Sequence, residues 1–229
     1  MENRKHTSLK DLAQALGVSI PTVSRALKDS PEISRELCAK AKELAKEMNY
    51  RPNPFAMSLR KNAPRIIGVV VPDIVTHFFA SILNGIENMA IANGYFVIIT
   101  TSHESYEHEK RNIENLVNMR VEGIIACLSQ ETTDFSHLSA LKNINMPLIL
   151  FDRVCLTDQF SSVVADGVQS AQMATQHLLN NGSKRVAFIG GANHLDIVKR
   201  RKHGYLEALR ENRIPIEKEL VVCRKIDYE

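Results

Sequence analysis

The sequence predicts two fold classes in one chain: a three-helix head, then doubly wound parallel α/β lobes, the second of them incomplete. Apolar residues recur at helical spacing in the first part of the chain. After Pro64, short continuous runs of Val, Ile and Leu alternate with helical stretches. Through Arg65 there are thirteen Lys and Arg against seven Asp and Glu, whereas the remainder has sixteen against nineteen. We therefore expect domains at residues 1–50, 51–64, 65–160 and 161–229.

The head begins with two short helices joined by a tight turn. Ser8 precedes the amphipathic stretch SLKDLAQAL, and Asp11 follows it by three residues, which is a capping-box pattern. Gly17 permits the left-handed backbone that ends this helix, and Ser19 can cap the next one. A third helix is expected from Ser34 to Met48. The spacing predicts a helix-turn-helix.

The second helix exposes a face suited to a ligand. Its inward positions are Val23, Ala26 and Leu27. The positions left facing outward are Ile20, Pro21, Thr22, Ser24 and Arg25. The basic charge of the head indicates a polyanion partner, because neutralising phosphates drives most non-specific DNA affinity. The alternative is a solvated basic face, and the helix-turn-helix pattern favours double-stranded DNA.

Residues 51–64 predict a hinge helix. Asn53 can cap a helix whose first position is Pro54, and Ala56 and Leu59 fall within its two turns. Two turns are too few for a helix that is stable alone in water. The alternative is an ordinary linker in which Leu59 packs on the next domain.

The later part of the chain predicts a parallel sheet. The runs RIIGVVVPD, YFVIIT, VEGIIACL and PLILFD begin near residues 65, 95, 121 and 147. Continuous apolar strands are buried on both faces, which is typical of parallel sheets with right-handed helical crossovers. SSVVAD, KRVAFIGG and KELVVC predict three strands of a second lobe, with helices Gln169 to Leu179 and Ile197 to Glu211 between them. We expect residues 161–229 to be marginally stable, because a half-built sheet exposes strand edges.

Ligands of open α/β sheets bind beyond the carboxyl ends of the strands. That rule selects polar and aromatic residues at the strand ends: Asp73, Thr76, His77, Phe78, Phe79, Thr101, Ser102, Ser129, Asp152, Arg153, Asn193 and Arg201. Rings stack on sugar faces, and carboxylates with arginines bond hydroxyls, so this composition suits a polar, ring-bearing metabolite. The alternative is a core aromatic for Phe79 and a turn cap for Asp152.

The segments VSIPTVSRAL, MNYRPN, SLR, VPD, FDR and RKHGY resemble the LacI/GalR (lactose and galactose repressor) family of bacterial transcription regulators. The resemblance is strong from Ser8 to Arg60 and looser to Glu229, where the chain stops before family members do. It implies periplasmic-binding-protein-like lobes, operator DNA bound by a homodimer, and a small effector such as a sugar or nucleotide-related metabolite. The expected function is a sequence-specific transcription regulator, a repressor, modulated by that effector.

The resemblance also implies roles for individual residues. Ile20, Pro21 and Arg25 occupy base-facing positions, and the Arg25 guanidinium suits the O6 and N7 acceptors of guanine, the alternative being a phosphate clamp. Phosphate candidates are Ser8, Ser19, Thr22 and Ser24, although Ser8 is equally explained as a cap. In the hinge, Asn53, Ala56 and Leu59 would meet DNA, with Leu59 as a minor-groove wedge. Effector contacts are expected from Asp73, which the strand-end rule selects, and from Phe78, Asp152 and Arg201, which the resemblance supports most directly.

Other classes of function find little support in the sequence. His103 and Glu104 with His108 have the wrong spacing for a helical zinc motif, and we expect a solvated loop there. No catalytic constellation or dinucleotide fingerprint is present, so the sequence predicts no enzyme, cofactor or metal. The lack of an eighteen-residue apolar run or an apolar leader favours a cytoplasmic protein without membrane contact over an exported sugar-binding protein. A DNA-binding module without an effector site stays open as the alternative.

Overall fold

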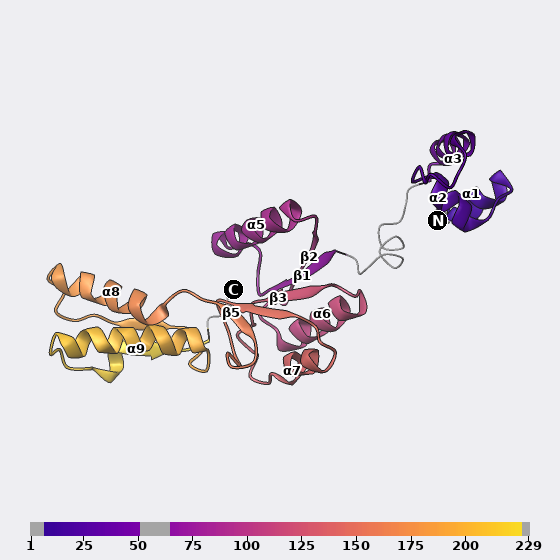
Figure 1. Ribbon diagram of the computed structural model, residues 1–229. Coiled ribbons are helices and arrows are strands. Elements are labelled where there is room, and N and C mark those ends of the chain that lie inside the picture. Colours follow the sequence, from indigo (N-terminus) through magenta and orange to yellow (C-terminus); the bar gives the residue numbers. More distant parts are fainter. Residues whose placement is uncertain (1–6, 51–64, 226–229) are drawn as a thin grey trace. The chain divides into compact units, whose positions relative to one another are not determined.

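The computed structural model describes residues 7–50 and 65–225, and the chain divides into two compact units, Met1–Asn62 and Ala63–Glu229. The first unit contains α1 (Leu9–Leu16), α2 (Ile20–Ala26) and α3 (Arg35–Glu47), labelled in Figure 1. The hinge positions Asn53, Ala56 and Leu59 lie outside the described residues. The three expected helices of the head are therefore confirmed, and the hinge helix stays a prediction.

Local side-chain caps set the ends of the head helices. Ser8 accepts the backbone N–H of Asp11, and the Asp11 carboxylate accepts the backbone N–H of Ser8, so the capping box is complete. Gly17 ends α1 in the left-handed region with φ 64°, a conformation that costs glycine little. The Ser19 hydroxyl caps α2 by accepting the Thr22 N–H at 3.3 Å. Residues close in sequence therefore determine where α1 ends and where α2 begins.

The head is held together by a small apolar core. Leu12, Val23 and Ala26 are fully buried. Partly buried side chains from α1, α3 and the segments beside the helices pack around Leu12 and Val23: Leu9, Leu16, Val18, Leu27, Leu44, Met48 and Tyr50. Ala26 packs with Cys38 and Ala41 in a second cluster that shares Leu16 and Leu27. Because α2 gives Val23 and Ala26 to the core, Ile20, Pro21 and Arg25 are left exposed.

The second unit begins with a five-stranded parallel sheet. Its strands are β1 (Ile66–Val71), β2 (Phe96–Thr101), β3 (Gly123–Ala126), β4 (Leu148–Phe151) and β5 (Ser161–Val163). Their spatial order is β2-β1-β3-β4-β5, and every neighbouring pair is parallel. Parallel neighbours bring all carboxyl ends to one edge of the sheet, which confirms the predicted architecture.

Helices cover both faces of this sheet. The first, α5 (His77–Ala92), packs Phe79 and Leu83 on one face. On the opposite face, α6 (Tyr106–Asn118) and α7 (Ser136–Asn143) bury Ile113, Leu116 and Leu138 against the strands (Figure 1). Packing on both faces fixes the positions of the strands and therefore of the loops at their carboxyl ends.

Two strands differ from the sequence expectation. The YFVIIT run was expected to be buried on both faces, yet β2 is an edge strand in which Phe96 is 68% exposed. The SSVVAD run was expected to begin the second lobe, yet β5 pairs with β4 through Ile149 and Ser161 and extends the first sheet. In both cases the pairing partner, distant in sequence, decides where the strand lies.

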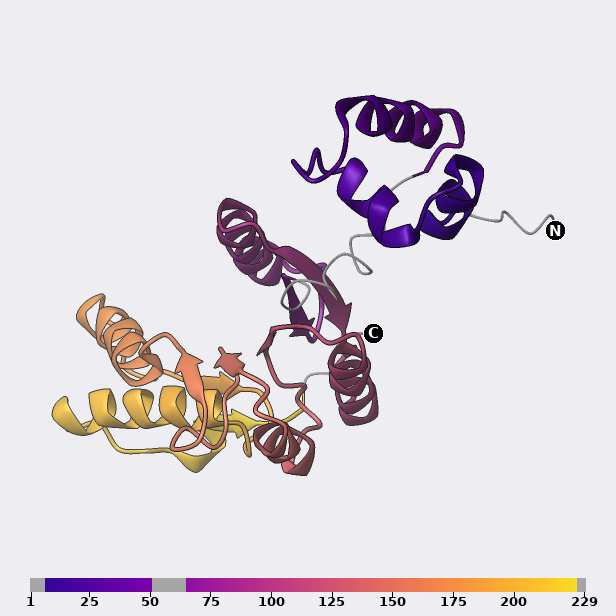
Figure 2. The same cartoon turned by 45° about the vertical axis from the view of Figure 1, so that its right-hand side comes forward.

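The second lobe contains α8 (Gly167–Asn180), β6 (Phe188–Gly190), α9 (Asp196–Glu211), a short 3-10 helix η1 (Lys218–Leu220) and β7 (Val221–Cys223). The strands β6 and β7 pair in parallel. Figures 1 and 2 both show α8 and α9 side by side. Gly204 lies at their contact, where an added Cβ would overlap the Val168 carbonyl oxygen and lie 3.0 Å from Gln172 N. The two helix backbones therefore meet with no space for a side chain.

Candidate functional site

The outward face of α2 matches the expected recognition surface. Ile20, Pro21 and Arg25 are exposed, whereas Val23 and Ala26 are buried. Arg25 Nη1 lies 3.4 Å from Glu32 Oε2, and both side chains are more than half exposed. Such an exposed pair contributes little to stability, so the guanidinium can exchange Glu32 for a nucleic-acid acceptor at low cost.

The four hydroxyl residues expected to meet phosphate already have local roles or partners. Ser8 Oγ donates to Asp11 Oδ2 at 2.7 Å, and Ser19 Oγ lies 2.8 Å from Thr22 Oγ1. Ser24 is half-buried on α2 and also has an intramolecular partner. The cap roles of Ser8 and Ser19 are therefore established by geometry, and their contacts to DNA stay predictions.

A cavity of about 330 Å³ opens at the carboxyl ends of the first sheet and faces the start of α9. We call it the cleft. Its lining comes from both lobes: Thr76, Phe78, Phe79, Glu104, Gln130, Asp152, Arg153, Gly191, Leu195, Ile197, Val198 and Arg201. Of the four expected effector residues, the structure brings Phe78, Asp152 and Arg201 together here. This position agrees with the strand-end rule for α/β folds.

Asp73 is the expected effector residue that does not line the cleft. Its carboxylate accepts the backbone N–H groups of Ile74 and Val75 at 2.6 and 3.0 Å. The side chain therefore stabilises the turn after β1, the alternative role that short acidic residues take in turns. Asp73 shapes the segment that leads into α5 and Phe78.

Asp152 supplies a charged acceptor in the cleft. Burial raises the pKa of its carboxyl group, and the positive charges of Arg153 and Arg201 oppose that shift. Cys127 Sγ lies 4.0 Å from Asp152 Oδ2, and burial raises the pKa of this thiol to about 12. The thiol therefore stays neutral, whereas Asp152 and Arg201 both line the cleft and can bind hydroxyl groups there.

Glu104 and Gln130 are polar cleft residues that the strand-end rule did not select from the sequence. The Glu104 carboxylate binds the Arg153 guanidinium through two hydrogen bonds, Oε2 to Nη1 at 2.6 Å and Oε1 to Nη2 at 2.9 Å. Both side chains are mostly buried, so the expected solvated loop is wrong at Glu104. A bidentate pair of this kind fixes orientation as well as charge. It joins the loop after β2 to the end of β4 across the cleft floor.

Phe78 and Phe79 divide two tasks between neighbouring positions. Both rings line the cleft, but Phe78 is 50% exposed, whereas Phe79 is buried against Phe151 with ring centroids 6.4 Å apart. The two neighbours meet edge to face at 5.2 Å. Phe79 thus serves both as the core aromatic of the alternative interpretation and as a support for Phe78.

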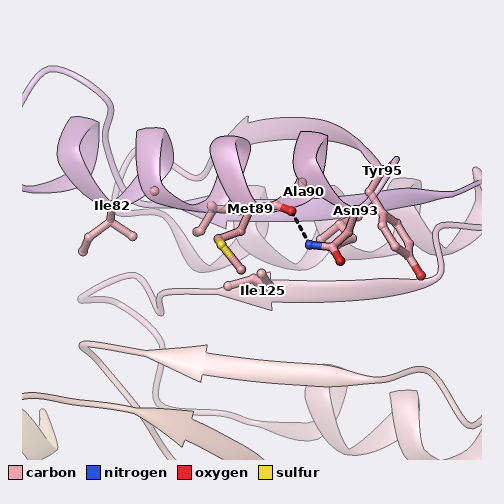
Figure 3. A pocket seen from close by; sticks show the side chains of 9 residues that line it. Ile82, Met89, Ala90, Asn93, Tyr95 and Ile125 are labelled. Atoms are coloured by element: carbon pink, nitrogen blue, oxygen red, sulfur yellow. Dashed lines mark hydrogen bonds between the residues drawn. The ribbon is translucent and has the colours of Figure 1, made fainter.

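A larger hollow of about 630 Å³ lies between α5 and the sheet, but its chemistry is different. Figure 3 shows Ile82 and Met89 of α5 beside Ile125 of β3. Two polar side chains are drawn there, those of Asn93 and Tyr95, and the Asn93 amide already donates to the Met89 carbonyl oxygen at 2.8 Å. A mostly apolar lining without charged groups does not select a polar metabolite. The cleft is therefore the better effector site.

Metal and membrane functions gain no structural support within residues 7–50 and 65–225. No three His, Cys, Asp or Glu side chains gather there as a metal site requires. The rings of His103 and His108 pack edge to face with centroids 6.3 Å apart. Over the same residues, no helix has the length and apolar character needed to span a bilayer.

A helix-turn-helix head followed by α/β lobes around a polar cleft defines a class of two-part regulators. Residues 8–53 match the family described as bacterial regulatory proteins, lacI family. Residues 65–229 match the family of periplasmic binding proteins and sugar binding domain of LacI family. The chain belongs to the LacI family of bacterial regulatory proteins, which confirms the resemblance carried by its motifs.

Curated relatives include catabolite control protein A of Priestia megaterium, 31% identical over 98% of this chain and 67% of its own length. The ribose operon repressor of Bacillus subtilis is 31% identical over 92% of this chain and 62% of its own length. The MalR regulator of Streptococcus pneumoniae is 33% identical over 90% and 64%. This chain thus spans about two thirds of the length of these relatives.

Solved structures show the same fold. The transcription regulator CcpA of Lactococcus lactis is 29% identical, with a TM-score of 0.66 over 71% of this chain and 59% of that chain. A lac repressor dimer bound to operator and the anti-inducer ONPF is 24% identical, with a TM-score of 0.74 over 96% and 66%. At that lower identity the likeness establishes the fold alone.

Proposed function

We propose that this chain is a sequence-specific DNA-binding transcription repressor whose operator affinity is modulated by a small, sugar-like effector. The observation that carries the proposal is the exposed face of α2 in a head that matches the lacI regulators over residues 8–53. The polar cleft supports the effector part, because Asp152, Arg201 and Phe78 offer charge, hydrogen bonds and a ring to one ligand.

We further propose that two copies act together on operator DNA in the cytoplasm and that the chain is not an enzyme. The lac repressor structure is a dimer bound to operator, which supports a two-fold arrangement here. Effector binding between the lobes would change their separation and so the spacing of two hinges in a dimer. Operator affinity then depends on which lobe arrangement is populated.

The DNA part is tested by selecting bound sites from random duplexes, followed by R25A. We expect R25A to lose about 1–3 kcal/mol of discrimination at one base pair of the selected site. The matched control is R35A, because Arg35 is exposed on α3 and its loss removes the same charge from the head. R35A should weaken selected and random DNA alike. An unchanged ratio of specific to random binding in R25A contradicts the base-reading role.

The effector part is tested by calorimetric titration of D-ribose, cellobiose and fructose 1-phosphate, compared between the unaltered chain and R201A. Saturable binding of one of these ligands that R201A weakens supports the proposed cleft. No binding of any of them by the unaltered chain favours the alternative, a DNA-binding module without an effector site.

A further inference from the structure

The segment between β3 and α7, which contributes Gln130 to the cleft lining, is held at each of three consecutive residues by a different partner. The Ser129 N–H donates to Glu109 Oε2 at 2.6 Å. The Gln130 N–H donates to Glu104 Oε2 at 2.7 Å. The Glu131 carboxylate pairs with Lys225, which follows β7 in the second lobe, at 3.1 Å. A short loop held in this way has one defined conformation.

Glu109 is the unexpected member of this arrangement. It lies on α6, is fully buried, and lines no part of the cleft. Its Oε1 accepts the Thr132 hydroxyl at 3.0 Å and lies 2.9 Å from His137 Nε2. Ser129 Oγ and Thr132 Oγ1 are 2.7 Å apart. The Glu109 carboxylate therefore binds the loop on both sides of Gln130, at Ser129 and at Thr132, and also contacts His137 at the start of α7.

A buried carboxylate is costly unless its hydrogen bonds are satisfied, and apolar replacements of buried ionic groups are often neutral or stabilising. A contribution to the stability of the fold therefore does not account for a buried carboxylate at position 109. The Tyr106 ring packs edge to face on His137 at 5.3 Å, which closes this cluster from the outside. What the cluster supports directly is the loop, and the loop carries Gln130.

Gln130 is 7% exposed and lines the cleft. Its backbone is fixed through Glu104, the same carboxylate that binds Arg153 on the cleft floor. We propose that Gln130 is a specificity-determining contact for the effector and that buried Glu109 is the residue that positions it. This inference rests on the proposed effector function and assigns the amide of Gln130 a role beside Asp152 and Arg201.

The test is a double-mutant cycle on effector affinity, using the ligand of D-ribose, cellobiose and fructose 1-phosphate that binds the unaltered chain most tightly. Q130A and E109Q should each weaken that binding about tenfold, the effect of one misplaced or missing hydrogen bond. In the Q130A background, E109Q should have no further effect, because both changes act on one contact. The matched control is E107Q, an exposed carboxylate on the same helix, which should bind normally.

A second measurement does not depend on the ligand. In E109Q, the backbone amides of Ser129 and Gln130 should exchange with deuterium faster than in E107Q, while amides of β1 and β3 keep their protection. If E109Q fails to fold, T132V removes one bond to Glu109 and keeps the charge, and a smaller affinity loss in the same direction is expected.

The possible results distinguish a failure of the proposed effector binding from a failure of the positioning role of Glu109. If the unaltered chain binds none of the three ligands, the result favours a DNA-binding module without an effector site, and the inference about Gln130 is overturned together with the effector function on which it rests. If it binds one of them and E109Q binds equally well, the positioning role of Glu109 alone is overturned. Equal losses from E109Q with and without Gln130 would show that Glu109 acts by another route, which also overturns the inference.

Discussion

Replacing Gly204 by alanine should destabilise the contact between α8 and α9 in the second lobe. The added Cβ would overlap the Val168 carbonyl oxygen and lie 2.9 Å from the carbonyl carbon of that residue. Carbon atoms pack best at about 3.5–4.0 Å, so this carbon contact alone requires α8 and α9 to separate by roughly 0.6–1.1 Å, and the overlapping carbonyl oxygen requires more. The three nearest neighbours of this Cβ are backbone atoms, which cannot rotate away as a side chain would.

The magnitude follows from that separation. A gap of about 0.5–1 Å forfeits a quarter to a half of each dispersion contact, and overpacking typically costs about 1–3 kcal/mol. The matched control is G85A on α5, where an added Cβ meets nothing within 4 Å. Alanine in a helix interior is better than glycine by roughly 0.5–1 kcal/mol, so G85A should stabilise the protein.

The assay is native-state hydrogen exchange, which reports opening of each lobe separately. G204A should lower amide protection in α8 and α9 while α6 and α7 keep theirs, and G85A should raise protection in α5. Wild-type protection of α8 and α9 in G204A would refute the argument, because the helices would then have absorbed the methyl group without separating.

Two further predictions concern individual polar contacts. S8A removes the capping box of α1 and should cost the head about 1 kcal/mol, seen as a lower midpoint in thermal unfolding followed by circular dichroism; an unchanged midpoint argues against it. The hydrogen bond from Lys225, together with the one from the Tyr106 N–H, lowers the pKa of Glu131. These bonds therefore stabilise the folded protein at pH values above the ordinary pKa of a glutamate, and the stabilisation is lost as the pH falls through the lowered pKa. In K225A the carboxyl titration of Glu131, followed by NMR, should move to higher pH; no movement contradicts the pairing.

The elements that the sequence predicted well are those fixed by near neighbours. Ser8 and Asp11 are three residues apart, and Gly17 directly follows the helix that it ends, so local chemistry decides these caps. The apolar runs likewise fixed the strands of the first sheet, because a continuous aliphatic segment has few other places to go.

The features that the sequence did not predict depend on distant partners. Nothing in SSVVAD states which sheet it joins, and the pairing of Ser161 with Ile149 decides it. Glu104 gains its role from Arg153, forty-nine residues later. Glu109 stands in a helix with many charged residues, and its burial follows from Ser129, twenty residues away. A charged residue beside a strand end is the one local signal that could have drawn attention to Glu104.

Asp152 adopts a left-handed backbone with φ 57° directly after β4. Aspartate and asparagine tolerate this region far better than branched or bulky residues do, and glycine adopts it freely. Few residue types can therefore replace Asp152 without straining the backbone. A descendant protein with a new ligand preference can replace the charged Asp152 by asparagine, which offers a neutral amide, or by glycine, which leaves space. Larger changes in the shape of the cleft must come from substitutions at Phe78 or Arg201.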